Sequence, residues 1–268
     1  MTSGTCSVPT MDTTSIVVAD VPLLRFALQR ADDALVLGHR LSEWCGHAPM
    51  LEEDLALSNT ALDLIGQATA LYRYAAEIED AGRTEDAYAY FRTDRDFANL
   101  LLLERPNGDF AETIVRLFLY AAFVAPYWQR MTASTDATLA AIAAKAQKEA
   151  AYHVRHAGAW VIRLGDGTDE SHARAQRALD ELWPYTGEMF TASAAESSLV
   201  DNGVAIDPAD LRASWRDMVT RVVDEATLDL PADGWMQSGG RIGRHSESLG
   251  LMLAEFQSVA RAHPGATW

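Results

Sequence analysis

The division of the chain into long helical blocks is the sequence feature that most constrains its fold. From Pro22 onward, apolar residues recur at helical spacing, and no stretch shows the sustained alternation with β-branched residues that is typical of strands. Glycine, proline and aspartate mark the breaks between the blocks. Four long helices are expected at residues 21–44, 51–79, 109–131 and 136–164. Long helices with short connections predict an all-α four-helix bundle.

Shorter helices are expected around this bundle, at residues 169–183, 207–228 and 250–262. The lengths of the long helices suit the ferritin-like group of bundles. No internal repeat or low-complexity linker divides the chain, so residues 21–268 are predicted to form a single ferritin-like domain with peripheral helices. Residues 1–20 are rich in serine and threonine and contain no lysine or arginine, which indicates a flexible N-terminal arm and not a signal peptide.

Two of the long helices have faces whose surroundings can be predicted. The helix at 51–79 is expected to turn one apolar stripe toward the core. This stripe consists of Leu51, Leu55, Leu62 and Ile65. The helix at 109–131 is apolar on nearly every face, so it lies either at the centre of the bundle or under a partner chain. Pro126 is expected to kink it.

The charge balance argues against two classes of partner. The chain has 22 Lys+Arg against 38 Asp+Glu, a formal net charge of −16. Such a surface repels phosphate backbones and anionic lipids, so we expect no nucleic acid and no membrane among its partners. The most apolar stretch, residues 117–128, is shorter than the roughly 20 residues that span a bilayer. Cys6 and Cys45 lie far apart in the sequence, so we expect no disulfide framework. The lack of such a framework is typical of a reducing compartment, and we expect a soluble, cytoplasmic protein.

A ferritin-like bundle often holds a di-metal site, in which two helices each supply a Glu-x-x-His pair. The spacing matters because residues i and i+3 lie on one helical face and can bind the same ions. The chain has 7 histidines, and none of them follows a glutamate by three positions. The sequence therefore lacks the motif on which a di-metal centre depends.

One alternative metal cluster remains open. Glu149, His153 and His156 lie within about two turns of one helix. They could hold a single metal ion and make the chain an oxygenase or oxidoreductase active in its own right. Lys148 and Arg155 crowd the same helix, however, and no second helix supplies an obvious partner. This favours an interior, hydrogen-bonded His153.

A glycine-rich segment at residues 238–244 carries Arg241 and Arg244. It lacks the Gly-Lys-Ser/Thr ending of a phosphate-binding loop and any preceding strand, so a loop is expected. The two arginines form a local cationic spot in an acidic protein, where an anionic ligand or a carboxylate of a partner could bind.

Three further patterns favour structural interpretations. A Cys45–His47 nucleophile is disfavoured, because the pair lies at a helix end and a lone cysteine usually behaves as a small buried apolar residue. Asp169 is expected to cap a helix, with His172 in solvent. Trp235 and Trp268 lie in loop or tail contexts, where burial needs another surface.

Four long segments, residues 37–68, 95–123, 148–190 and 240–268, closely resemble one known family. It is the PaaC family, the non-catalytic subunits of bacterial phenylacetyl-coenzyme A 1,2-epoxidases. The resemblance covers nearly everything after the N-terminal arm. It implies a ferritin-like bundle without a working metal centre, paired with a homologous catalytic subunit that holds the di-iron site.

The resemblance also identifies the positions of a degenerate di-iron site. In the motif that runs from Asp63 to Gln67, Leu64 stands where the catalytic subunit has a ligand glutamate, and Gln67 stands where it has a ligand histidine. In the second motif Ala150 replaces the glutamate, whereas His153 remains. The resemblance therefore implies that this chain has no catalytic residue and binds no cofactor.

The role implied by the resemblance is that of a structural subunit in aerobic phenylacetate catabolism. The complex epoxidises the aromatic ring of phenylacetyl-CoA with dioxygen and with electrons from a separate reductase. Phenylacetyl-CoA is expected to be bound mainly by the catalytic partner. Large permanent interfaces resemble a core cut in half, so an obligate partner surface would explain the apolar helix at 109–131, although the sequence does not show which helices form the interface.

Overall fold

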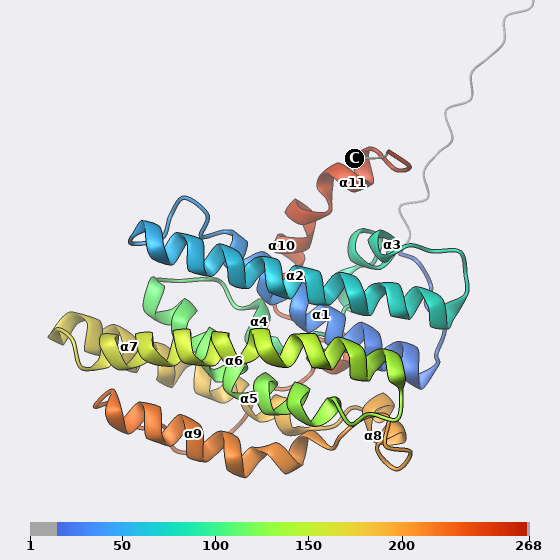
Figure 1. The fold of residues 1–268 in the computed structure, drawn as a ribbon. Coiled ribbons are helices and arrows are strands. Elements are labelled where there is room, and N and C mark those ends of the chain that lie inside the picture. Colours follow the sequence, from blue (N-terminus) through green and yellow to red (C-terminus); the bar gives the residue numbers. More distant parts are fainter. Residues whose placement is uncertain (1–14, 267–268) are drawn as a thin grey trace, which may run out of the picture.

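The computed structural model describes residues 15–266, and within that range it contains helices and turns but no strand (Figure 1). The four long helices are α1 (Pro22–Ser42), α2 (Leu51–Glu79), α5 (Phe110–Met131) and α6 (Ala137–Gly165). The helices α1 and α2 form one antiparallel pair, α5 and α6 form a second, and α2 packs beside α6. The protein is an all-α, ferritin-like four-helix bundle with peripheral helices, which confirms the predicted fold class.

In the part of the chain that the structure describes, seven shorter helices surround the bundle: α3 (Glu85–Tyr90), α4 (Leu101–Glu104), α7 (Asp169–Leu182), α8 (Ala194–Val200), α9 (Arg212–Glu225), α10 (Glu247–Phe256) and α11 (Ser258–Ala262). In Figure 1, α7 and α9 lie on the α5–α6 side of the bundle, whereas α10 and α11 extend away from its body. The helix predicted to begin at residue 207 starts as a 3-10 turn, Pro208–Leu211, and becomes α-helical only at Arg212.

The helix α5 is the central element of the fold. It packs against α4, α6, α7 and α9 of its own chain, and nearly all of its side chains are buried. Its length and composition alone would allow it to cross a membrane, but 78% of its most apolar window is buried inside the protein, as in the core helix of a globular fold. Of the two predicted alternatives, the structure has the central position in the bundle, because the chain itself covers this helix. Pro126 lies within α5, and the helix continues past it to Met131.

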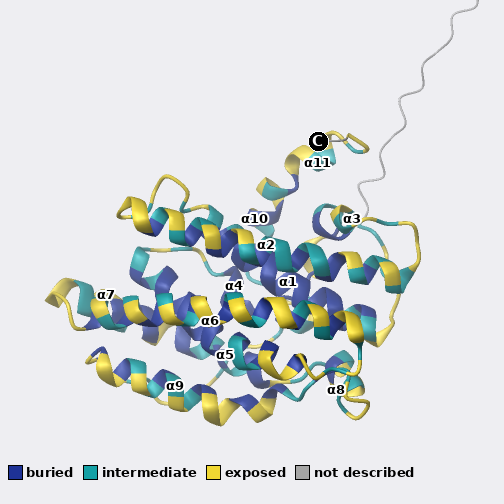
Figure 2. Ribbon diagram, viewed as in Figure 1, coloured by how far each residue is buried: buried dark blue, intermediate teal, exposed yellow. Residues whose placement is uncertain are grey.

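The predicted inward stripe of α2 is also wrong. Leu51, Leu55 and Leu62 are 71%, 56% and 66% exposed, and Ile65 is only partly buried. The face that α2 turns inward alternates large and small residues, namely Glu53, Leu57, Thr60, Ala61, Leu64, Ala68, Leu71, Tyr72 and Ala75. Small side chains on this face let α1 come close: a Cβ atom on Gly38 would lie 3.2 Å from the backbone oxygen of Ala61. Figure 2 shows the resulting outward face of α2.

The N-terminal segment lies on the bundle as far as the structure describes it. The amide of Ile16 donates to the carbonyl of Phe91 at 3.0 Å, and the side chains of Ile16 and Val18 pack against the core. The rest of the predicted arm, residues 1–14, lies outside the described residues.

Candidate functional site

The four positions of the expected degenerate metal site lie on two adjacent helices. Leu64 and Gln67 belong to α2, and Ala150 and His153 belong to α6. Leu64, Ala150 and His153 are buried, whereas Gln67 is partly exposed. The side chains of Leu64 and Ala150 carry no lone pairs. The donor set at these positions therefore does not fit a di-iron centre, which needs several carboxylates and histidines.

The remaining histidine at this site, His153, is bound to α2. Its Nε2 atom lies 3.1 Å from a carboxylate oxygen of Asp63, and because a carboxylate only accepts, this nitrogen carries the hydrogen. Burial lowers the pKa of His153 below its usual value, and the hydrogen bond to Asp63 only partly offsets that effect. His153 is thus a neutral, hydrogen-bonded histidine that joins α6 to α2.

The three residues of the alternative metal cluster have different partners. Besides the His153–Asp63 contact, His156 Nε2 lies 2.8 Å from Glu53, and Glu149 lies 3.4 Å from Lys145. Burial raises the pKa of Glu149, and the nearby charge of Asp63 adds to that shift. Among residues 15–266, no group of three or more His, Cys, Asp or Glu side chains is arranged to hold a metal ion.

The two arginines of the predicted anion site have different surroundings. The guanidinium of Arg241 forms two hydrogen bonds to Asp33 on α1, at 2.9 and 2.7 Å, and donates to the carbonyl of Ala98 at 2.6 Å. Its side chain is only 8% exposed, so this arginine anchors its loop to α1 and has little capacity left for an external anion. Arg244 is exposed.

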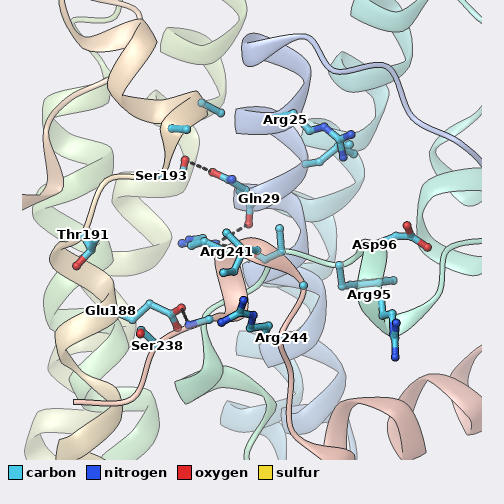
Figure 3. A pocket seen from close by; sticks show the side chains of 18 of the residues that line it. Arg25, Gln29, Arg95, Asp96, Glu188, Thr191, Ser193, Ser238, Arg241 and Arg244 are labelled. Atoms are coloured by element: carbon cyan, nitrogen blue, oxygen red, sulfur yellow. Dashed lines mark hydrogen bonds between the residues drawn. The ribbon is translucent and has the colours of Figure 1, made fainter. Parts of the chain in front are cut away.

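A cavity of about 690 Å³ lies beside this loop, between α1 and the segment that leads into α8 (Figure 3). Arg25, Arg95 and Arg244 contribute cations to its lining, and Asp20, Asp96 and Glu188 contribute carboxylates. Glu188 accepts hydrogen bonds from the amides of Gly239 and Gly240 at 2.9 and 2.8 Å. None of the described lining residues is His, Cys or Lys. The charges of the cavity nearly balance, and among the described lining residues it offers no pair of a nucleophile and a base.

The Cys45–His47 pair does not form a catalytic dyad. Cys45 is exposed rather than buried, and His47 contacts the carbonyl of Cys45 at 3.0 Å instead of its sulfur.

The start of α7 differs from the expectation, because Thr168 and not Asp169 caps it, by accepting from the amide of Ser171 at 3.2 Å. His172 Nδ1 contacts the carbonyl of Gly165 at 2.8 Å. Trp235 is 74% exposed, and Trp268 lies outside the described residues.

Buried ion pairs that the sequence does not predict hold the outer segments on α1. The carboxylate of Asp32 is fully buried and pairs with Arg92 at 2.5 Å, while Tyr72 donates to it at 2.6 Å. Burial alone would lower the pKa of His245, but its contacts with Glu104 outweigh that effect and raise the pKa. Such pairs join residues far apart in the chain, so no local sequence pattern predicts them.

Comparison with known proteins gives concordant results. A family model described as "Phenylacetic acid catabolic protein" matches residues 10–268. Over 246 residues the chain is 47% identical to a protein of Escherichia coli (strain K12) that is named as one of the subunits of 1,2-phenylacetyl-CoA epoxidase. The alignment covers 92% of this chain and 99% of that relative.

Proposed function

The chain belongs to the family of phenylacetic acid catabolic proteins, and from that premise we propose that it is the structural, metal-free subunit of a phenylacetyl-CoA 1,2-epoxidase. The identity to a protein named as part of such an epoxidase, over almost the full length of both, supports a place for this chain in the complex. In this role the chain takes part in aerobic phenylacetate catabolism in the cytoplasm but performs no chemical step itself.

The observation that carries the metal-free part of the proposal is the pair Leu64 and Ala150. Both are buried on the facing helices α2 and α6, at the two positions where a di-iron bundle needs glutamates. His153 nearby is already hydrogen-bonded to Asp63. Two iron ions between these helices would lack the carboxylates that balance their positive charge. The di-iron centre therefore belongs to a homologous catalytic subunit.

The work of this chain is then to bind and stabilise that catalytic subunit. The catalytic subunit supplies most of the phenylacetyl-CoA site, and a separate reductase supplies electrons. What the chain itself offers is a rigid body, with a core that spans all four long helices and buried ion pairs that fix the outer segments.

Co-expression with the catalytic subunit from the same organism tests this role. We expect the two chains to purify as one stable complex, and the chain expressed alone to self-associate or precipitate. Epoxidation of phenylacetyl-CoA, assayed with the reductase, should need the catalytic subunit and be lost when this chain is supplied without it. A well-behaved monomer that does not bind the catalytic subunit would contradict the proposal, as would epoxidation by this chain and the reductase alone.

A further inference from the structure

The cavity beside the loop at residues 238–244 lies apart from the degenerate metal site (Figure 3). None of its described lining residues belongs to α2 or α6, the two helices that carry the metal positions. Its volume of about 690 Å³ is within the range of roughly 300–1,000 Å³ that is typical of pockets for small organic molecules. A ligand bound in this cavity would therefore not touch Leu64, Ala150 or His153.

The carboxylates in the wall of the cavity already have partners. Asp20 pairs with Arg25 at 3.4 Å, and Asp96 accepts a hydrogen bond from the amide of Thr93 at 3.0 Å. Glu188 is buried and accepts from three backbone amides at distances of 2.8 to 2.9 Å. Groups of the chain itself therefore compensate the negative charges of the wall.

Two cations of the lining have no such partners. The side chains of Arg95 and Arg244 are exposed, and within residues 15–266 neither guanidinium group forms a hydrogen bond or an ion pair. The loop packs directly on residue 95, because a Cβ atom on Gly243 would collide with the backbone oxygen of Arg95. The two arginines also line a neighbouring hollow of about 470 Å³. Guanidinium groups bind carboxylates and phosphates through paired hydrogen bonds, so these arginines favour an anion as the ligand.

The side-chain amide of Gln29 on α1 is a buried donor in the same cavity. The residue is only 6% exposed, and its Oε1 atom accepts from the hydroxyl of Ser193 at 2.8 Å. Figure 3 shows Gln29 between Ser193 and Arg241. Within the described residues its NH₂ group donates to no acceptor, although buried amide groups nearly always have hydrogen-bond partners. An oxygen-bearing ligand in the cavity would supply the acceptor.

The lining also contains an exposed apolar side chain. Ile242 is 69% exposed, and it borders both the cavity and the neighbouring hollow. Small-molecule sites combine apolar surface with a few polar groups that fix the orientation of the ligand. An apolar side chain beside two unpaired cations therefore suits an anion with an apolar part better than a free inorganic ion.

We propose that this cavity binds a small organic anion, whose carboxylate or phosphate group pairs with Arg95 and Arg244 and whose apolar part contacts Ile242. The NH₂ group of Gln29 donates to an oxygen of the ligand. This site is additional to the proposed function and does not depend on it, because it needs no contact with a catalytic subunit.

Three matched probes test the site: benzoate, phenyl phosphate and benzamide. The first two carry a carboxylate and a phosphate on the same ring, and benzamide has the shape of benzoate without its charge. Isothermal titration calorimetry is performed on the purified full-length chain, in complex with the catalytic subunit or alone, in whichever state it purifies. We expect saturable binding of at least one of the two anions and none of benzamide. The tighter anion shows whether the site prefers a carboxylate or a phosphate.

The double variant Arg95→Gln/Arg244→Gln shows where the anion binds. Loss of the charged donors should weaken binding about 10-fold or more. The control Arg155→Gln changes an exposed arginine of α6 outside the cavity and should bind like the wild type. Circular dichroism shows that the variants remain folded. The catalytic subunit, where present, is the same in all samples, so a difference between variants belongs to this chain.

Gln29→Glu adds an independent readout. It keeps an oxygen that accepts from Ser193 but replaces the NH₂ group with a carboxylate oxygen. A negative charge that faces the cavity repels an anion, so this variant should also weaken binding about 10-fold or more.

The outcomes decide the inference without bearing on the proposed function, which co-purification with the catalytic subunit tests separately. If neither anion binds, or if benzamide binds as tightly as the anions, the inference is overturned. The same holds if the double variant binds like the wild type, because the anions then bind elsewhere. Inorganic phosphate that binds as tightly as phenyl phosphate would contradict the organic nature of the ligand.

Discussion

Single buried residues decide how the outer segments of this protein are held. Asp32 and Asp33, adjacent on α1, are both fully buried, yet they face different partners. Asp32 pairs with Arg92, and Asp33 pairs with Arg241. A buried charge costs several kcal/mol when it loses its partner, so each pair fixes one segment in place.

Arg92→Met should show how much one of these pairs contributes. It leaves the carboxylate of Asp32 buried without its cation, so we expect the free energy of unfolding to fall by about 3–5 kcal/mol. The control is Arg73→Met, because the pair of Arg73 with Glu85 lies at the surface, where solvent screens it, and its loss should lower the free energy of unfolding much less. Urea unfolding of the two variants measures the difference, and equal losses would contradict the role given to the buried pair.

The two buried histidines should respond to pH in opposite directions. The folded-state pKa of His245 is raised, so its contact with Glu104 stabilises the fold fully below the unfolded pKa of about 6.5 and is lost as the pH rises through the folded value. The pKa of His153 is lowered, so the fold loses stability as the pH falls below about 6.5, because only the unfolded chain takes up the proton there.

Urea unfolding at several pH values checks this. His245→Gln should cost more stability at pH 6 than at pH 9, whereas His153→Gln should reduce the loss of stability between pH 7 and pH 5. Identical pH profiles for the wild type and both variants would contradict the assignment.

At the scale of helices, periodicity predicts the residue ranges of the long helices well, but it predicts poorly which side of a helix faces the core. The sequence predicts α2 at the residues where the structure has it, because caps, breaks and helical spacing act locally. It does not predict which side of α2 faces α1, because both the inward and the outward side of the helix carry leucines. The short helices α3, α4 and α8 were not predicted, since a helix of one or two turns is stable only through its tertiary contacts.

Two helical glycines test this account of the α1–α2 contact. Gly38→Val should cost about 1–3 kcal/mol, because its Cβ atom would lie 3.2 Å from atoms of Ala61, Leu64 and Ile65. Gly66→Ala on the outward side of α2 meets only the end of Lys145, at 3.9 Å, and should stabilise the isolated chain by about 0.5–1 kcal/mol. Thermal unfolding of both variants measures these changes in stability. A stable Gly38→Val protein would show that the close helix contact is not needed.

At the scale of the whole molecule, the candidate site could be predicted only in part. The missing carboxylates are visible in the sequence, because residue identities at Leu64 and Ala150 exclude ligands in any fold. The partners of His153 and Arg241 are not visible, because they lie 90 and 208 residues away in the chain. The apolar helix α5, for which a central position and a partner surface were both open, is buried by the chain itself, and the leucines of α2 that were assigned to the core are exposed.

The orientations of α2 and α5 could not be predicted for one physical reason. Hydrophobicity alone predicts that both α5 and the leucines of α2 are buried. It does not show whether the same chain or another chain buries them. The chain packs α7 and α9 over α5 and α6, whereas it leaves the side of α2 that carries Leu51, Leu55 and Leu62 exposed.

The most direct test of the central claim is native mass spectrometry of the reconstituted complex, with iron counted for each subunit after gentle dissociation. We expect about two iron ions on the catalytic subunit and none on this chain, even after incubation with excess ferrous iron. The variant Leu64→Glu/Gln67→His/Ala150→Glu, treated in the same way, shows whether restored ligands capture iron and serves as the positive control. One or two iron ions bound stoichiometrically to the wild-type chain would contradict the account of a structural, metal-free subunit.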